Sequence, residues 1–202
     1  MSLLLGRNRF GSPDNTGNVL TRNEANALLN EWVLNNKLKL HMSQVAGLMA
    51  AWAHEKLNLS EDQCWKWEMA GLLHDADWDQ WPDQHCKKII EHLESLQIDP
   101  EILRAIASHG PIHFGVEPET DMDKMLYAFD ELSGLIHAYS LMRPEGYTGM
   151  ELKGVKKRLK EKTFASNVSR DDIQDACQRA GIELDLLITF ILKHQANFQL
   201  PE

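Results

Sequence analysis

Histidine and aspartate recur along the chain at positions where imidazole and carboxylate ligands could meet. His74 and Asp75 are adjacent at the end of an apolar run, and the same stretch, LLHDADWDQWPDQH, brings His85 eleven positions after His74. Imidazole nitrogen and carboxylate oxygen are suitable ligands for divalent first-row metals. A carboxylate has two oxygens, so Asp75 could serve two ions at once. Two-metal sites, with ions about 3.5–4 Å apart, clamp both ends of a phosphoryl displacement.

Three further residues join this set by type and by position on the predicted helices. His41 lies near the start of one helix, His109 at the end of another and Asp130 in the middle of a third. Asp130 follows Phe129 and lies one turn after Leu126, so it borders an apolar face. A carboxylate there is costly to bury unless it is paired or bound to a metal. The pattern therefore indicates metal ligation.

The elements that must position these residues are predicted to be helices. Thr21 and Ser60 each open a capping box, Asp99 precedes a proline at a first helical position, and Thr120 and Ser169 are further N-caps. Together with apolar periodicity, these signals predict helices over about 22–34, 38–58, 61–77, 83–96, 100–109, 121–142, 150–162 and 183–197, one further helix that starts after Ser169, and a loop over 110–119. No alternating strand signal is present. We expect an all-α fold of about eight or nine helices.

The predicted organisation is one helical domain with an irregular beginning. Residues 1–20 are rich in Gly, Asn and Pro and are expected to be irregular. Residues 21–145 form the helical core that carries the candidate ligands, and the helices of 146–202 pack on the same domain.

Composition narrows the functional class. The 202 residues are 43% hydrophobic and 25% charged, and the net charge of −9 argues against a long nucleic acid as partner. No apolar run approaches the roughly 20 residues that cross a membrane, and the start of the chain is too short in apolar residues for a secretory signal. The three cysteines are scattered and suit a reducing compartment, so a cytoplasmic location is expected. An acidic protein that handles anionic substrates must supply local cations, either side chains or metal ions.

The order of the candidate ligands resembles that of a known family. His41, then His74-Asp75, then Asp130 in an all-helical chain is similar to the HD-domain superfamily of metal-dependent phosphohydrolases. The surrounding sequences AGLLHDAD, ILRAIASHG and MLYAFDELSGLI agree, and the resemblance covers roughly residues 25–140. The C-terminal part resembles a subgroup of HDIG-type predicted hydrolases without a settled substrate. By position, the resemblance implies that the core metal ligands are His41, His74, Asp75 and Asp130. It implies that the additional histidines for a second ion are His85 and His109.

This resemblance implies a function and leaves alternatives. It implies hydrolysis of a small phosphate ester, with a nucleotide among the candidate substrates. The attacking water is activated by divalent ions, and the number of ligands favours two ions over one. His74 and Asp75 are the expected catalytic residues. Mn, Fe, Mg, Zn and Co are not distinguished. A di-iron oxygenase on the same ligands and a non-catalytic metal-binding or interaction module are the alternatives. A homodimer is compatible with the sequence, which does not determine the oligomeric state.

The chain departs from the commonest family motif directly after the doublet. Many members read HDIGK, whereas this chain reads HDADW. The absent lysine means that charge stabilisation must come from elsewhere. It also removes the basis for transferring a substrate from the lysine-bearing subgroups.

Candidate substrate contacts are the basic and polar residues outside the ligand set. His113 in the loop is either a substrate contact or an exposed histidine. A basic stripe on the helix MELKGVKKRLKEK is either a solvated face or, with Arg143, a clamp for phosphate; it comprises Lys153, Lys156, Lys157 and Lys160.

Two further groups of residues have weaker expectations. Asp77, Asp79 and Asp83 form a solvated acidic turn, unless Asp77 or Asp79 orients a ligand histidine. His137 is expected to have no catalytic part.

Overall fold

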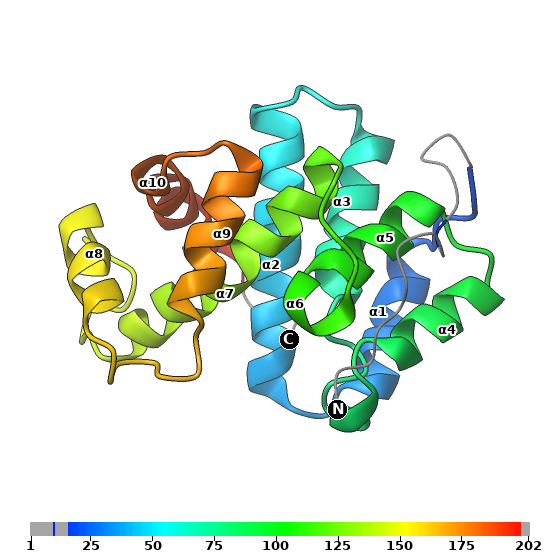
Figure 1. The fold of residues 1–202 in the computed structure, drawn as a ribbon, viewed down its shortest axis with the longest axis horizontal. Helices are drawn as coiled ribbons and strands as arrows, with labels where there is room; N and C mark the ends of the chain where they lie inside the picture. The colour runs from blue at the N-terminus through cyan, green and yellow to red at the C-terminus, as the bar shows by residue number, and fades with distance from the viewer. Residues whose placement is uncertain (1–9, 11–15, 199–202) are drawn as a thin grey trace.

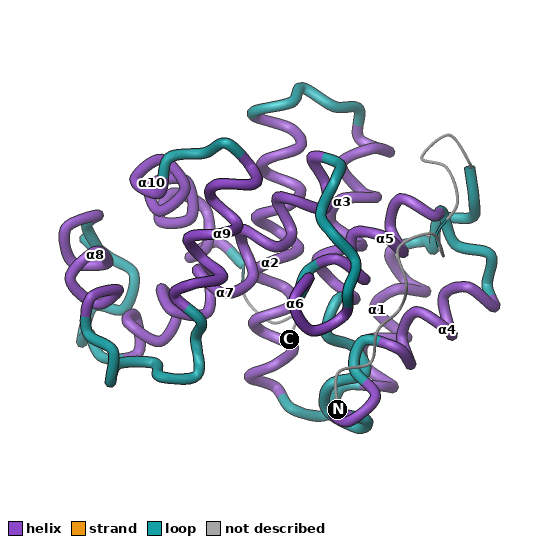
Figure 2. The backbone as a smooth tube through the Cα atoms, viewed as in Figure 1, coloured by secondary structure: helices purple, strands orange, loops and turns teal. Residues whose placement is uncertain are grey.

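Helices begin where the sequence places its capping residues. The computed structural model describes residue 10 and residues 16–198, and their regular elements are helices without a β-strand (Figure 2). Thr21, Ser60 and Thr120 each complete a capping box, and Asp99 and Ser169 accept hydrogen bonds from the first turns of their helices. The all-α class is confirmed. The helices begin at these positions because the side chains there satisfy backbone N–H groups that have no partner within the helix.

Ten α-helices and two 3-10 turns make up the described part of the chain (Figure 1). They are α1 (Arg22–Trp32), α2 (Asn36–Glu55), α3 (Glu61–Leu73), η1 (Pro82–Gln84), α4 (Lys87–Ser95), α5 (Pro100–Ser108), α6 (Pro111–Phe114), α7 (Asp121–Leu141), α8 (Leu152–Lys160), α9 (Arg170–Ala180), α10 (Leu184–His194) and η2 (Gln195–Asn197). The count is close to the eight or nine helices that the sequence predicts.

Three predicted boundaries were wrong. The third helix ends at Leu73 rather than at 77, so Asp75 and Asp77 lie in the turn after it. The predicted loop after His109 contains the short helix α6, where Pro111 occupies the first turn and Gly115 ends the helix in the left-handed conformation, at φ 74°. The fourth helix begins at Lys87 rather than at 83, and His85 lies between η1 and α4. The periodicity of 83–96 could not reveal this start, because the carboxylate that serves the first turn of α4 comes from another part of the chain, as described below.

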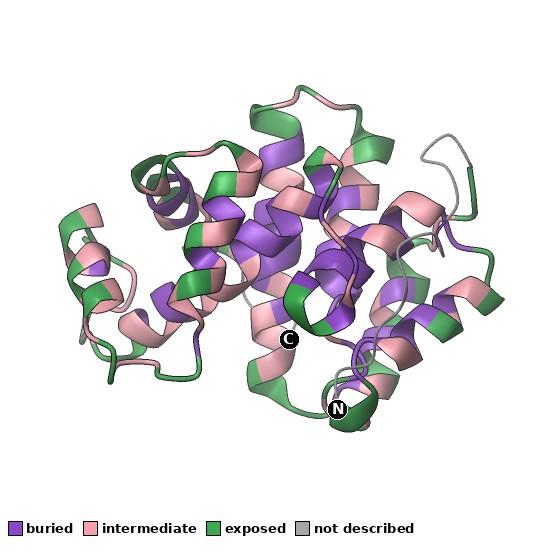
Figure 3. Ribbon diagram, in the orientation of Figure 1, coloured by how far each residue is buried: buried purple, intermediate pink, exposed green. Residues whose placement is uncertain are grey.

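The centre of the molecule is the packing of α2 against α3, with α7 and α5 laid across them (Figure 1). A Cβ atom at Gly71 of α3 would lie 2.8 Å from the backbone of Ala46 in α2, so the two helices approach as closely as a glycine permits. The inner faces of these helices are buried (Figure 3). The apolar core thus holds the helices that carry His41, His74 and Asp130 in a fixed relation.

The C-terminal helices pack on this core. α9 lies along α7, and α10 contacts α2, α7 and α8. Of the predicted irregular segment 1–20, only residues 10 and 16–20 lie within the described residues. There, the backbone N–H of Asn18 donates to the carbonyl of Gln97 at 2.8 Å, and its carbonyl accepts from the N–H of Asp99 at 2.9 Å.

Two predictions drawn from composition can be compared with the structure. Among the described residues, no helix combines the length and apolar character needed to cross a membrane. Cys64, Cys86 and Cys177 form no disulfide, and two of them, Cys86 and Cys177, are buried. The cysteines are therefore thiols, as expected for packing residues.

Candidate metal centre

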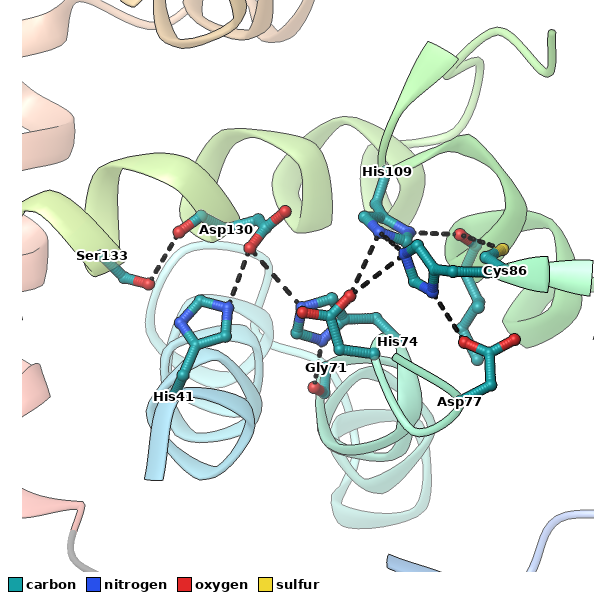
Figure 4. Close-up of polar contacts among 11 residues, drawn as sticks. His41, Gly71, His74, Asp77, Cys86, His109, Asp130 and Ser133 are labelled. Atoms are coloured by element: carbon teal, nitrogen blue, oxygen red, sulfur yellow. Dashed lines mark hydrogen bonds and ion pairs between the residues drawn. The ribbon is translucent and has the colours of Figure 1, made fainter. Parts of the chain in front are cut away.

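Histidines and aspartates from separate elements converge at the meeting point of α2, α3, α5 and α7 (Figure 4). His74 is the C-cap of α3 and His109 the C-cap of α5, so both follow the last helical turn. The structure brings together all six residues that the sequence singled out as ligands, in two groups: His41, His74, Asp75 and Asp130, and Asp75, His85 and His109.

The first group surrounds one potential ion position. Asp130 Oδ1 lies 2.9 Å from His41 Nε2 and 3.5 Å from His74 Nε2. Asp75 Oδ2 lies 3.4 Å from His74 Nε2. One ligand atom from each of these residues lies within 4.8 Å of all the others, which is the spacing of atoms that share a metal ion.

The second group uses the other oxygen of the same carboxylate. Asp75 Oδ1 lies 3.3 Å from His85 Nε2 and 3.5 Å from His109 Nε2. Asp75 therefore presents Oδ2 to one group and Oδ1 to the other. The two groups of candidate ligands therefore share this carboxylate.

The opposite ring nitrogens fix how the histidines face the cluster. Nδ1 of His74 donates to the carbonyl of Gly71 at 2.8 Å, and Nδ1 of His109 donates to the carbonyl of Ile106 at 2.6 Å. Nδ1 of His85 lies 2.6 Å from a carboxylate oxygen of Asp77. Carbonyl and carboxylate oxygens accept hydrogen bonds, so each ring turns Nε2 towards the cluster, and a ring that has lost its Nε2 proton presents a lone pair there.

Two features of these lone pairs fit a bound cation. His74 Nε2 is buried and has no hydrogen-bond partner, although buried polar atoms are nearly always paired. The Nε2 atoms of His85 and His109 face each other at 3.3 Å. Two lone pairs at this distance repel unless a proton or a metal ion lies between or beside them. The residues present therefore fit the divalent ions that the sequence predicts.

Asp77 combines two tasks at this site. Its side chain is buried; Oδ1 accepts from His85, and Oδ2 accepts from the backbone N–H of Ile89 at 2.9 Å. Ile89 is the third residue of α4, and the side chain of the N-cap residue Cys86 makes no hydrogen bond to the first turn of that helix. The carboxylate of Asp77 thus starts α4 and orients His85 at the same time.

The neighbouring aspartates behave differently. Asp79 accepts from the N–H groups of Leu34 and Asn35, at 2.7 and 2.9 Å, just before α2. Asp83 is exposed. Of the acidic turn that the sequence predicts to be solvated, only Asp83 fits that description fully, and Asp77 follows the alternative reading in which it orients a ligand histidine.

Charges in the cluster stabilise one another. Burial disfavours the His74 cation, but the carboxylates of Asp75 and Asp130 outweigh burial and hold the pKa of His74 well above its usual value. Burial alone would raise the pKa of Asp75, yet His74 and the other histidines hold it well below the usual range. A divalent cation can take the place of the protons that otherwise balance these carboxylates.

A cavity of about 1030 Å³ opens beside the cluster. Five of the six candidate ligands, all but His74, contribute to its wall, and so does the exposed side chain of His113. Its lining comprises His41, Asp75, Trp78, Pro82, Asp83, His85, His109, Gly110, His113, Phe114, Tyr127, Asp130, Glu131, Gly134, His137, Ala138, Ala165, Asn167, Val168 and Asp172.

The predicted phosphate clamp does not line this cavity. Arg143 and the four lysines of α8 surround a separate hollow of about 790 Å³, which α8 and the end of α7 form. The guanidinium of Arg143 donates to the carbonyls of Gly146 and Thr148, and Lys156 pairs with Asp185 at 2.7 Å. The interpretation as a solvated basic face therefore describes Lys153, Lys157 and Lys160, which are exposed.

Two cavity residues were missed by the sequence reasoning. His137, for which no part was expected, lies in the wall together with Glu131. Burial and the neighbouring Asp130 raise the pKa of Glu131 to about 8. The available signal was helical spacing, since His137 follows Asp130 by seven residues and therefore shares its face of α7.

Comparison of the chain with protein-family models, with curated proteins and with solved structures found no match.

Proposed function

We propose that the protein is a metal-dependent phosphohydrolase of the HD-domain type that acts on a small phosphate ester. The observation that supports it most is Asp75, whose two oxygens face two different groups of ligands. Bound divalent ions would supply activated water for attack on phosphorus and would neutralise charge on the phosphoryl oxygens. The ligand cluster lines a cavity large enough for a small organic phosphate.

The protein's own residues divide the work of this site. His41, His74 and Asp130 would hold one ion, His85 and His109 would hold the other, and Asp75 would contribute an oxygen to each group. Of the described residues that line the cavity, none is a lysine or an arginine. The ions and their histidines must therefore supply the charge stabilisation that a lysine after the doublet would otherwise provide.

A substitution at the shared carboxylate tests the proposal. Protein loaded with manganese or iron is assayed against a panel of phosphomonoesters and phosphodiesters, as wild type, Asp75→Asn and Asp62→Asn. We expect metal-dependent turnover in the wild type and in Asp62→Asn, which removes an exposed charge of α3 outside the cavity lining. Asp75→Asn should lose turnover, because an amide bridges two cations poorly. Metal-dependent turnover that survives Asp75→Asn would rule out this assignment.

A di-iron oxygenase is the second candidate. The lack of lysine and arginine in the cavity lining also suits a substrate without phosphate. Metal analysis of protein purified without chelator separates the two: two irons with a mixed-valence signal support the oxygenase, and zinc, manganese or magnesium supports hydrolysis. A protein whose unfolding temperature responds to no divalent ion would instead be a non-catalytic module.

A further inference from the structure

The cavity extends beyond the metal cluster along one face of α7. Asp130, Gly134, His137 and Ala138 all line it, with the i, i+4, i+7 and i+8 spacing of a single helix face. The segment before α9 forms the opposite wall, through Ala165, Asn167 and Val168, and Asp172 of α9 completes it. This end of the cavity holds none of the six candidate ligands except Asp130 at its border.

Gly134 keeps this end open. A Cβ atom at this position would meet nothing within 4 Å, so packing does not require a glycine there. Glycine inside a helix is less favourable than alanine by about 1 kcal/mol. The residue that the helix disfavours thus stands where a larger side chain would fill the cavity.

A chain of buried amides fixes the ring of His137 beside this opening. Gln195 Nε2 donates to the carbonyl of Ser133 at 2.9 Å and to Gln44 Oε1 at 2.8 Å. The amide nitrogen of Gln44 then donates to the Tyr147 hydroxyl at 3.1 Å, and that hydroxyl lies 2.8 Å from His137 Nδ1.

One arrangement of protons along this chain makes the ring of His137 a donor to the cavity. Tyr147 oxygen accepts from Gln44, and its hydroxyl proton can point to Nδ1 of His137 or to the side chain of Ser140. With the proton on the side of Nδ1, the neutral ring carries its own proton on Nε2, the nitrogen that Tyr147 does not occupy. His137 lines the cavity, so Nε2–H is a hydrogen-bond donor for a molecule bound there.

The charge of this end restricts what can bind. Its carboxyl groups are Glu131 and Asp172, and the described lining contains no lysine or arginine. Ser169 donates its backbone N–H to Glu131 at 3.2 Å, which is the one hydrogen bond that this carboxyl group makes among the described residues. A second phosphate placed here would face the Asp172 carboxylate without a compensating cation.

We infer that this end of the cavity is the site for the leaving group of a phosphate monoester, and that this leaving group is uncharged and rich in hydroxyls. The single phosphate of the substrate lies at the metal cluster, and His137 Nε2–H donates to a substrate hydroxyl. The inference rests on the proposed function for the placement of the phosphate at the metal cluster. It narrows the substrate to sugar-like or polyol monophosphates and excludes polyphosphates.

Binding to manganese-loaded protein tests this subsite without requiring turnover. Calorimetry compares inorganic phosphate, fructose, fructose 6-phosphate and fructose 1,6-bisphosphate, the last two being matched except for the second phosphate. We expect fructose 6-phosphate to bind about tenfold or more tightly than the bisphosphate, since like-charge contacts oppose the second phosphate. Inorganic phosphate should bind through the metal end alone.

Substitutions on α7 localise the binding. Gly134→Leu should weaken fructose 6-phosphate binding to the level of inorganic phosphate, whereas Gly134→Ala, the small control, should retain most of it. His137→Phe should weaken the sugar phosphate and leave inorganic phosphate unchanged. His137→Gln places an amide donor near the position of Nε2 and should restore part of the affinity. Unfolding temperatures of the four variants verify that each is folded.

Each outcome separates the two proposals. Equal or tighter binding of the bisphosphate, or undiminished fructose 6-phosphate binding by Gly134→Leu, overturns the subsite. If fructose 6-phosphate, fructose 1,6-bisphosphate and inorganic phosphate all fail to bind, the phosphohydrolase proposal fails. Fructose then tests the subsite alone. Fructose binding that Gly134→Leu abolishes supports the subsite, and absence of fructose binding overturns the subsite as well.

Discussion

Asp75 and Asp77 show how two carboxylates two positions apart acquire different tasks. Asp75 turns one oxygen to each group of candidate ligands. Asp77 is fully buried, and its two oxygens accept hydrogen bonds from His85 and from the backbone N–H of Ile89. The difference arises because the turn after α3 points Asp75 towards the histidines of the cluster and Asp77 towards the start of α4. Identical side chains therefore serve as a candidate ligand and as a support for one.

Replacing Asp77 should weaken the second metal position selectively. Asp77→Ala leaves Nδ1 of His85 and the N–H of Ile89 without their acceptor. Loss of such a supporting group typically reduces metal affinity about 10–100-fold. Metal titration should show one ion bound nearly as in the wild type and one bound more weakly. Asp83→Ala is the control, and equal weakening in both variants would contradict the supporting role.

His137 should make stability depend on pH. Burial, and then the charge of His41, lower its pKa below 6.5, so the folded state binds the proton less readily than the unfolded state. A lowered histidine pKa means that wild-type stability is lost as pH falls below about 6.5, relative to a variant without this group. Denaturant unfolding of wild type and His137→Gln across pH 5–8 measures the difference. A difference that does not change with pH would refute the assignment of a neutral ring.

At the level of elements, the approach of α2 to α3 sets the geometry of the site. Gly71 makes this approach possible, and its carbonyl also accepts from Nδ1 of His74. His41 lies on the partner helix α2. One glycine therefore determines both the separation of two ligand-bearing helices and the orientation of one ligand.

A methyl group at this contact should disturb stability and metal binding together. Gly71→Ala places Cβ 2.8 Å from the backbone of Ala46, which cannot move as a flexible side chain could. Overpacking of this kind costs about 1–3 kcal/mol of unfolding free energy. Gly134→Ala is the matched control: its Cβ meets nothing within 4 Å, so it should instead stabilise α7 by up to about 1 kcal/mol. Calorimetric unfolding of both variants checks the opposite signs.

At the level of the whole molecule, the candidate centre joins parts of the chain that lie far apart in sequence. Its ligands come from α2, the ends of α3 and α5, the segment before α4, and α7. α8, α9 and α10 contribute no candidate ligand within the described residues, but α9 and the segment before it close the cavity. Ions bound here would therefore stabilise the fold as a whole.

Removing metal should lower the unfolding temperature of the whole domain. A ligand present at 100 times its dissociation constant adds about 2.7 kcal/mol to stability if it binds only the folded state. Chelator treatment should lower the unfolding temperature of the wild type, and manganese should restore it. Asp130→Asn, which removes one candidate ligand, should respond much less. Unfolding that is indifferent to chelator and manganese in the wild type would argue against the site.

Much of the fold followed from local sequence patterns. The capping residues Thr21, Ser60 and Thr120 satisfy N–H groups only three residues away, so their effect is visible in the sequence. The start of α4 was not visible, because Asp77 reaches its first turn across the intervening residues 78–86. Likewise, the carboxylate of Asp79, in the turn after α3, accepts a hydrogen bond from the backbone N–H of Leu34 just before α2.

The candidate site divides in the same way. The types and order of the histidines and aspartates, together with the family resemblance that this order carries, determined from the sequence which six residues to consider, because imidazole and carboxylate suit divalent ions. Only the tertiary structure decided that Asp75 faces both groups, that His137 borders the cavity and that the lysines of α8 lie around a different hollow. Helix periodicity fixes which residues share a face, whereas the packing of one helix on another decides what that face meets.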